Sequence, residues 1–213
     1  MLKTLHAWLL AGALGMTATS QAMAEDFTDG ATNLYITLFL HDQLSEQEIR
    51  DLNEDYLPWF VNELEEVTGR RVSIQPVRHA PGYTDFPYRN DDIGAAIETW
   101  SQRVAEYIDS NNLPSSHRHK YVLLTHHKIN ASTHGVAYET QNGAIASLRS
   151  TVTLAHEVGH LFGATHENAE SRFEAPWFCN TIMYPTDEVL KGHCRAYSER
   201  NRQAIRDYLD QAP

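Results

Sequence analysis

Apolar residues along the chain fall into two patterns, short uninterrupted runs and longer stretches with helical spacing. The runs 33–40 and 121–124 are rich in β-branched and aromatic residues, which predicts strands that are buried on both faces. Alternation of apolar and polar residues over 72–77 predicts a third strand. Two shorter strands are predicted at 133–140 and 144–148.

The longer stretches predict helices. The first begins at Ser45 and ends at Gly69, and Pro58 within it predicts a kink or a break because proline cannot donate to the helical ladder. Asp91 or Asp92 is the expected N-cap of the second helix. Two further helices are predicted at 151–162 and at 198–210.

The order of these elements predicts the fold class. Strand, helix, strand, helix, strand, two short strands and a helix favour an α/β fold. We expect a mostly parallel, twisted sheet with helices packed on it and an antiparallel edge strand at 133–140. Asn142-Gly143 is a tight-turn signal between the two short strands. The 213 residues contain no repeat and no long linker, so we expect one compact domain.

The composition and the net charge restrict the classes of partner that we expect. Hydrophobic residues make up 42% of the chain and charged residues 21%, as in globular proteins. The formal net charge is −11, which argues against nucleic acid and anionic membranes as partners.

The first 24 residues have the pattern of a secretory signal peptide. Lys3 supplies the positive start, 5–14 is a short apolar run, and Ala22-Met23-Ala24 is a cleavage site of the A-x-A type. The alternative is a membrane helix, for which this run is too short. We therefore expect an exported protein, secreted or periplasmic, whose mature chain is 25–213. No later stretch is apolar enough to span a bilayer.

The chain has two cysteines, Cys179 and Cys194. In an exported protein an even pair usually forms a disulfide, and two free thiols are the alternative.

The stretch from His156 to His166 carries the most specific chemistry and reads H-E-x-x-H-x-x-G-x-x-H. His156 and His160 are four residues apart, so a helix would place both imidazoles on one face. Gly163 is the expected end of that helix, because a residue without a Cβ enters the left-handed region at little cost. The turn there would bring His166 back as a third ligand.

Three neutral imidazoles with a fourth position open to water are typical of catalytic zinc. We expect one catalytic zinc ion held by these three histidines. Glu157 follows the first ligand, and its carboxylate would reach a water on the metal without occupying a metal position. The alternative is a helix with ordinary surface histidines, which does not account for so many matching positions.

A second stretch resembles a known family. Met183 follows the third histidine by seventeen residues, in the segment Cys179-Asn180-Thr181-Ile182-Met183-Tyr184-Pro185. Alone it would be an ordinary core methionine. After the histidine motif it resembles the Met-turn methionine of the metzincin metallopeptidases. In that clan the methionine packs beneath the zinc site and is not a ligand.

Other segments are similar to particular metzincin branches. The segment 135–138 and the C-terminal stretch 194–209 resemble the reprolysin or adamalysin branch. Glu167 after the third histidine is astacin-like, and Tyr184-Pro185 after the methionine is matrixin-like. The likeness implies one catalytic domain with an N-terminal subdomain of about 25–166 and a small C-terminal subdomain of about 167–213.

The resemblance also implies how a substrate binds. An extended peptide would pair by backbone hydrogen bonds with Gly135, Val136, Ala137 and Tyr138. Tyr184 would wall the pocket for the side chain after the cut, or it would simply pack beside the turn.

The predicted function is that of a zinc-dependent endopeptidase. Zinc would lower the pKa of a bound water from about 15.7 toward 7. Glu157 would take the proton as general base and return it to the leaving amine. We expect a monomer that acts on a protein or peptide substrate, with an inhibitor protein as a possible partner. The alternative is a secreted, metal-stabilised binding, adhesin-like or toxin-like protein, against which the intact Glu157 argues.

Several other polar residues are expected to be unremarkable. The segment 117–120 is predicted as a solvated turn, and the acidic residues Glu63, Glu65 and Glu66 as an exposed helix face. The aromatic residues of loop 78–90 are expected to pin that loop to the body rather than to cover the cleft. Four histidines are expected to be solvated or hydrogen-bonded rather than to form a second metal site: His126, His127, His134 and His193.

Overall fold

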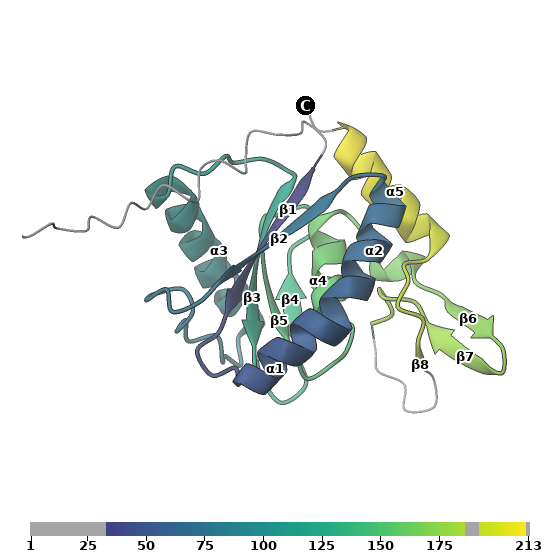
Figure 1. Ribbon diagram of the computed structural model, residues 1–213, viewed down its shortest axis with the longest axis horizontal. Helices are drawn as coiled ribbons and strands as arrows, with labels where there is room; N and C mark the ends of the chain where they lie inside the picture. The colour runs from purple at the N-terminus through teal and green to yellow at the C-terminus, as the bar shows by residue number, and fades with distance from the viewer. Residues whose placement is uncertain (1–32, 186–191, 212–213) are drawn as a thin grey trace, which may run out of the picture. The chain divides into compact units, whose positions relative to one another are not determined.

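The computed structural model describes residues 33–185 and 192–211, so the predicted signal segment lies outside the described residues. The main sheet has five strands in the order β2-β1-β3-β5-β4 (Figure 1). Three parallel pairings join β2, β1, β3 and β5, and β4 pairs antiparallel with β5 at the edge, as predicted. The strands are β1 Leu34–Leu40, β2 Val72–Val77, β3 His119–Thr125, β4 Gly135–Ala137 and β5 Gly143–Ser147.

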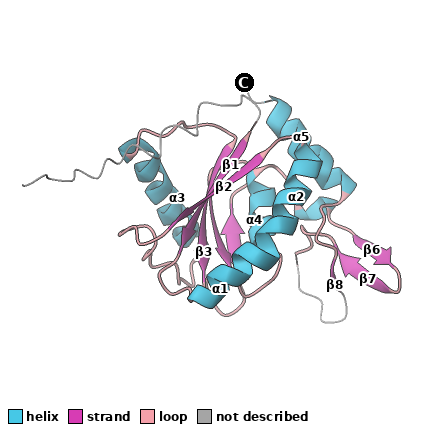
Figure 2. Cartoon of the chain, viewed as in Figure 1, coloured by secondary structure: helices cyan, strands magenta, loops and turns pink. Residues whose placement is uncertain are grey.

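Helices lie on both faces of this sheet (Figure 2). Helix α3 covers one face, whereas α2, α4 and α5 pack on the other. None of the described helices is long and apolar enough to cross a bilayer. The helical segments are α1 Glu46–Asp51, the π-helical η1 Leu52–Tyr56, α2 Leu57–Thr68, α3 Ile93–Ser110, α4 Thr153–Leu161, the 3-10 turn η2 His166–Asn168 and α5 Glu199–Gln211.

The interior strand β1 shows why its sequence is a nearly continuous apolar run. Successive side chains of a strand point to opposite faces. Leu38 and Leu40 pack in the core beneath α2, α4 and α5, whereas Phe39 between them packs against α3. Both faces of the sheet are therefore buried, which removes the alternation that a half-exposed strand would show.

The helix around Pro58 is continuous rather than broken. The π-helical segment η1 widens the backbone immediately before α2, and Pro58 is in the first turn of α2. A proline is tolerated in the first turn of a helix because its fixed φ suits the helical backbone. Gly69 ends α2 in the left-handed conformation with φ 65°, as the sequence predicts.

The loop between β2 and α3 is held by its aromatic residues. Phe86 and Tyr88 are 3% and 2% exposed and pack in the core beneath α3. The prediction that they pin the loop is confirmed.

The segment 117–120 is not the solvated turn that its charges suggest. Lys120 is fully buried in β3, where its Nζ donates to the Gln141 carbonyl at 2.9 Å and to the Tyr208 hydroxyl at 3.0 Å. Burial lowers the pKa of Lys120 from 10.5 to about 7. The prediction was wrong because the oxygen partners that make this burial tolerable come from distant parts of the chain.

The prediction that Glu63, Glu65 and Glu66 form an exposed helix face was wrong for Glu63. Glu63 is buried, and its carboxylate accepts from the Tyr197 N–H at 2.8 Å and from Arg202 at 2.7 Å. Burial nevertheless raises the pKa of Glu63. These bonds tie α2 to the start of α5.

A small second sheet, absent from our sequence prediction, follows the third histidine. It contains β6 Ser171–Glu174, β7 Trp177–Asn180 and β8 Gly192–His193. The predicted disulfide between Cys179 and Cys194 is present and joins β7 to the residue after β8. The Asn142-Gly143 signal does not form a two-residue hairpin, because Gly143 is already the first residue of β5.

Candidate metal centre

Helix α4 places the first two histidines on one face. His156 and His160 are one turn apart, and their ring centroids are separated by 4.9 Å. Two residues beyond α4, Gly163 adopts a φ of 85°, in the left-handed region that suits glycine. The chain then turns back, so that η2 begins at His166 beside the helix that it has just left.

The three histidine rings converge through the same type of atom. His166 Nε2 lies 2.9 Å from His156 Nε2 and 3.1 Å from His160 Nε2. Zinc–nitrogen bonds of about 2.0–2.1 Å in a tetrahedral site separate neighbouring ligand nitrogens by about 3.3 Å. The spacing of the three nitrogens is therefore close to that of ligands around one small cation.

Backbone carbonyl groups set the orientation of two of these rings. His156 Nδ1 lies 2.8 Å from the Ile182 carbonyl oxygen, and His160 Nδ1 lies 3.0 Å from that of Ala164. A carbonyl oxygen only accepts, so Nδ1 of each ring carries the hydrogen. In a neutral imidazole Nε2 is then the acceptor, and both acceptors face His166. This set of lone pairs fits a divalent cation.

Electrostatics keep these rings neutral. Burial, together with the neighbouring His160, lowers the pKa of His156 to about 3. Burial lowers the pKa of His160 to about 4, with a contribution from His166. Both rings are therefore unprotonated at neutral pH, which is the form that binds metal.

Two tyrosines that our sequence analysis did not single out for the site hold the first turn of α4. The Ala155 N–H donates to the Tyr56 hydroxyl at 2.8 Å, and the Tyr197 hydroxyl donates to the Ala155 carbonyl at 2.6 Å. Ala155 precedes His156, so these bonds fix the position of the first ligand. Tyr56 lies 99 residues before Ala155 in the chain, and no local signal gives its hydroxyl this role.

Asn201 was also missed, and it holds the loop before the third histidine. It is fully buried in α5. Its Oδ1 accepts from the Thr165 N–H at 2.9 Å, and its Nδ2 donates to the Thr165 carbonyl at 3.1 Å. This pair of bonds clamps the residue next to His166. A hydrophilic residue on the inner face of the last helix is the one sequence signal for it.

Replacing Asn201 by alanine is expected to weaken zinc binding about tenfold and to lower the free energy of unfolding by about 1–2 kcal/mol. The Thr165 N–H and carbonyl would lose their partners, and His166 would lose its support. Chelator competition and urea unfolding measure the two effects. Gln203→Ala, on the exposed side of α5, is the matched control and should change neither. Unchanged zinc affinity in Asn201→Ala would contradict the positioning role.

Glu157 lies beside the edge strand. A Cβ built on Gly135 would stand 2.5 Å from Glu157 Oε1, so the carboxyl group lies against the bare backbone of β4. Burial raises the pKa of Glu157 well above its ordinary value of 4.5. A buried carboxyl group of this kind favours the neutral form unless a cation is nearby.

The histidines and Glu157 share a cavity of about 780 Å³. Gly135, Val136 and Ala137 of β4 form one side of it, and Tyr184 and Pro185 also line it. In the described residues, β4 pairs with β5 alone, so its other edge has no strand beside it. Tyr138 is not brought to this cavity, because it follows the end of β4 and is 44% exposed.

Met183 lies beneath the metal helix. It is fully buried, and a Cβ built on Gly159 would stand 2.6 Å from its sulfur. Gly159 lies between the two helical histidines, so the thioether packs directly against the backbone that carries them. Met183 is not among the residues that line the cavity.

Comparison with known proteins shows the fold. No protein-family model matches the chain, and no curated protein matches its sequence. The structure is similar to that of metalloproteinase-II from Bacteroides fragilis, with a TM-score of 0.57 and 16% identity. The match covers 83% of this chain and 53% of that one, so the chain spans about half the length of this relative. The two proteins share a mixed α/β fold.

A zinc-dependent peptidase from Methanocorpusculum labreanum (strain Z) is a second neighbour, with 20% identity. The match covers 80% of this chain and 99% of that one, at a TM-score of 0.44.

Proposed function

We propose that the protein is an exported zinc-dependent endopeptidase of the metzincin clan. One observation carries the proposal: three ring nitrogens with converging lone pairs and a buried carboxyl group face one cavity. The fold shared with a metalloproteinase agrees with it. The mixture of reprolysin-, astacin- and matrixin-like residues supports the clan rather than one branch.

His156, His160 and His166 would hold the ion, and their nitrogen donors suit zinc. A bound zinc ion would act as a Lewis acid that acidifies water and polarises a peptide carbonyl. Its charge would also favour the carboxylate form of Glu157 against the effect of burial. Glu157 would then take a proton from water on Oε and pass it to the nitrogen of the leaving amine.

The substrate would bind at the edge of the sheet. The backbone of Gly135–Ala137 has hydrogen-bonding groups that the rest of the described sheet does not use, and it lines the cavity. An extended peptide could pair there as an added strand. Tyr184 would stand at the wall of the same cavity.

Metal analysis combined with digestion of an unstructured protein such as casein tests the proposal. We expect about one zinc per chain, digestion that a chelator abolishes, and recovery when zinc is added back. A chain that holds no metal would overturn the proposal. A chain that holds zinc tightly but digests nothing would favour the metal-stabilised binding protein instead.

A further inference from the structure

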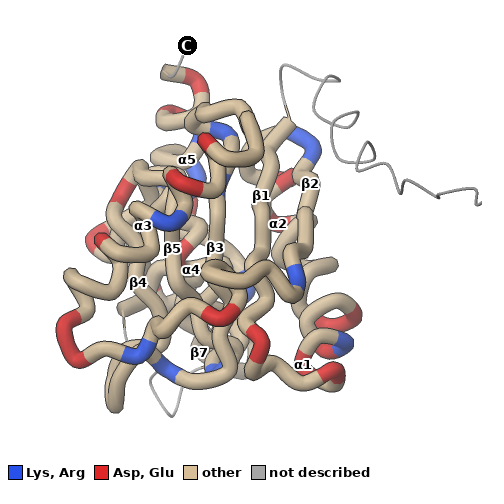
Figure 3. Tube along the Cα trace, turned by 90° about the vertical axis from the view of Figure 1, so that its left-hand side faces the viewer, with Lys and Arg blue, Asp and Glu red and all other residues tan. Residues whose placement is uncertain are grey.

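A second cavity, of about 850 Å³, adjoins the proposed metal cavity and has a basic lining. Arg89, Lys128 and Arg149 line it, and Asp91 is its one acidic residue. The full chain has a net charge of −11, whereas the cationic residues of this lining outnumber its one acidic residue. Figure 3 shows basic segments gathered on the loops below β4 and β5. We call this cavity the basic pocket.

The basic pocket is continuous with the metal cavity. Lys128 and His134 line both. His134 directly precedes β4, so a peptide that leaves the edge of β4 at Gly135 passes into the basic pocket. An extended chain advances about 3.3 Å per residue, which places the pocket within a few residues of the cut bond.

Three loops build the pocket, each after the carboxyl end of a parallel strand. Arg89 lies in the loop after β2, Lys128 in the loop after β3 and Arg149 in the turn after β5. The carboxyl ends of parallel strands meet at one edge of a sheet, where ligands often bind.

Backbone hydrogen bonds tie these loops together. The Asn90 N–H donates to the Ile129 carbonyl at 3.1 Å, which joins the loops of Arg89 and Lys128. The Leu148 N–H donates to the Thr125 carbonyl at 2.9 Å, which joins the turn of Arg149 to the end of β3. The three loops therefore hold one another in place, and the backbone of the pocket is preorganised.

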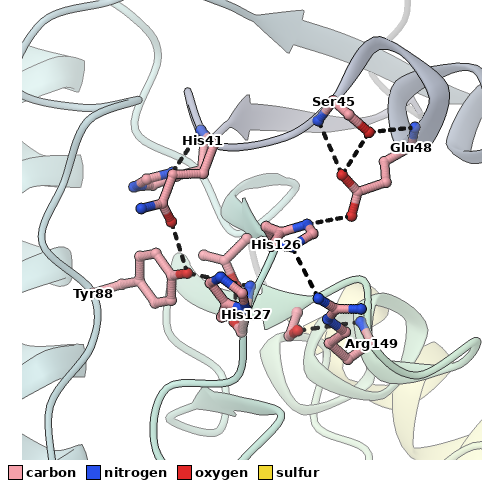
Figure 4. A network of polar contacts seen from close by, with 10 residues as sticks. His41, Ser45, Glu48, Tyr88, His126, His127 and Arg149 are labelled. Atoms are coloured by element: carbon pink, nitrogen blue, oxygen red, sulfur yellow. Dashed lines mark hydrogen bonds and ion pairs between the residues drawn. The ribbon is translucent and has the colours of Figure 1, made fainter.

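A relay of side chains orients Arg149 (Figure 4). Its guanidinium donates to His126 Nε2 at 2.9 Å. Arginine only donates, so this nitrogen is the acceptor, and Nδ1 of the ring donates to Glu48 Oε1 at 2.5 Å. Glu48 is held in turn by the capping box with Ser45 at the start of α1. His126, which was predicted to be solvated or hydrogen-bonded, is therefore hydrogen-bonded and orients the Arg149 side chain.

The other two cations are available to a ligand. Across 33–185 and 192–211, neither Arg89 nor Lys128 takes part in an ion pair or a side-chain hydrogen bond. Arg89 is exposed and Lys128 half-buried.

We propose that the basic pocket is a specificity subsite that binds the carboxylate of an Asp or Glu side chain flanking the cut bond. The inference rests on the proposed peptidase function and names its substrate class, acidic segments of polypeptide. A polypeptide is favoured over other anions because the pocket opens from the cavity that would hold the peptide backbone. Guanidinium and ammonium groups bind carboxylates by charge-assisted hydrogen bonds.

Cut-site profiling in a peptide library tests the subsite. The wild-type chain should cut preferentially where Asp or Glu occupies one fixed position near the cut. Arg89→Glu and Lys128→Glu should each lower kcat/KM for such peptides about threefold to tenfold, and should raise it for peptides with Lys at that position. Arg200→Glu is the matched control, since Arg200 is exposed on α5 away from both cavities, and it should keep the wild-type preference.

A binding measurement separates this inference from the peptidase proposal. An acidic peptide should bind the zinc-loaded Glu157→Gln chain more tightly than its Asn/Gln counterpart does. The difference should shrink between about 0.05 M and about 0.5 M salt, as the Debye length falls from about 14 Å to about 4 Å. If neither the wild-type chain nor any variant digests a substrate, the peptidase proposal is wrong. If the wild-type chain digests peptides without a preference for Asp or Glu, the subsite alone is overturned. The subsite is also overturned if Arg89→Glu and Lys128→Glu both keep the wild-type preference. Binding of a sulfated polysaccharide in place of any peptide preference would also overturn it.

Discussion

Replacing Glu157 by glutamine is expected to lower kcat by about 10²–10⁴-fold while zinc stays bound. Glutamine has nearly the same shape, so the contact with Gly135 of β4 is kept. An amide oxygen cannot take a proton from water, and therefore the general base is lost. Initial rates on a fluorogenic peptide, together with the zinc content of the same sample, measure the two effects.

Glu167→Gln is the matched control for this substitution. Glu167 is a carboxylate next to a metal-site histidine, but it is exposed and does not line the cavity. We expect its rate to stay within about twofold of wild type, since an exposed carboxylate that does not line the cavity is not placed to take the proton from water. Comparable turnover in Glu157→Gln and Glu167→Gln would remove Glu157 from the mechanism.

Replacing Gly159 by alanine is expected to lower the free energy of unfolding by about 3 kcal/mol and the zinc affinity about 100-fold. The added methyl would stand 2.6 Å from Met183 Sδ and 2.8 Å from Tyr197 Cε1, and both side chains are fully buried. Tyr197 cannot retreat without breaking its bond to the Ala155 carbonyl. Helix α4 would therefore move, and the histidines would move with it.

Gly94→Ala in α3 is the matched control, because it is the same substitution at a helical position with more space around the added methyl group. Its Cβ would meet only Asp92 Oδ1 at 3.3 Å and the Tyr138 hydroxyl at 3.8 Å. We expect a change in stability of about 0.5 kcal/mol or less, because the better helix propensity of alanine offsets the close contact. Urea unfolding and chelator competition compare the two variants. If Gly159→Ala is as stable as Gly94→Ala, the packing of Met183 beneath the helix is not a tight constraint.

The strands and helices that build the metal cavity were predictable because their determinants are local. Burial on both faces makes β1 and the 121–124 part of β3 apolar runs, and helical spacing marks α3 and α4. The small sheet after His166 was not predictable, since its short strands include exposed aromatic residues such as Trp177, at 75%, and have no apolar face.

The supports of the site were not predictable for a different reason. Tyr56 and Ala155 are 99 residues apart, and Thr165 and Asn201 are 36 apart. The local sequence around one residue of such a pair does not identify the residue that it contacts. Lys120 and Glu63 were misjudged in the same way, because a charged residue is buried only where distant groups satisfy it.

The amino-acid sequence by itself determined the spacing of the three histidines, the position of Glu157 and the glycine that turns the chain back at Gly163. These depend on helix periodicity and on the freedom of a residue without a Cβ. Only the tertiary structure decided which carbonyl groups orient the rings and which three loops meet to form the basic pocket. Those contacts join residues far apart in the chain, and the packing of the parallel sheet is what brings them together.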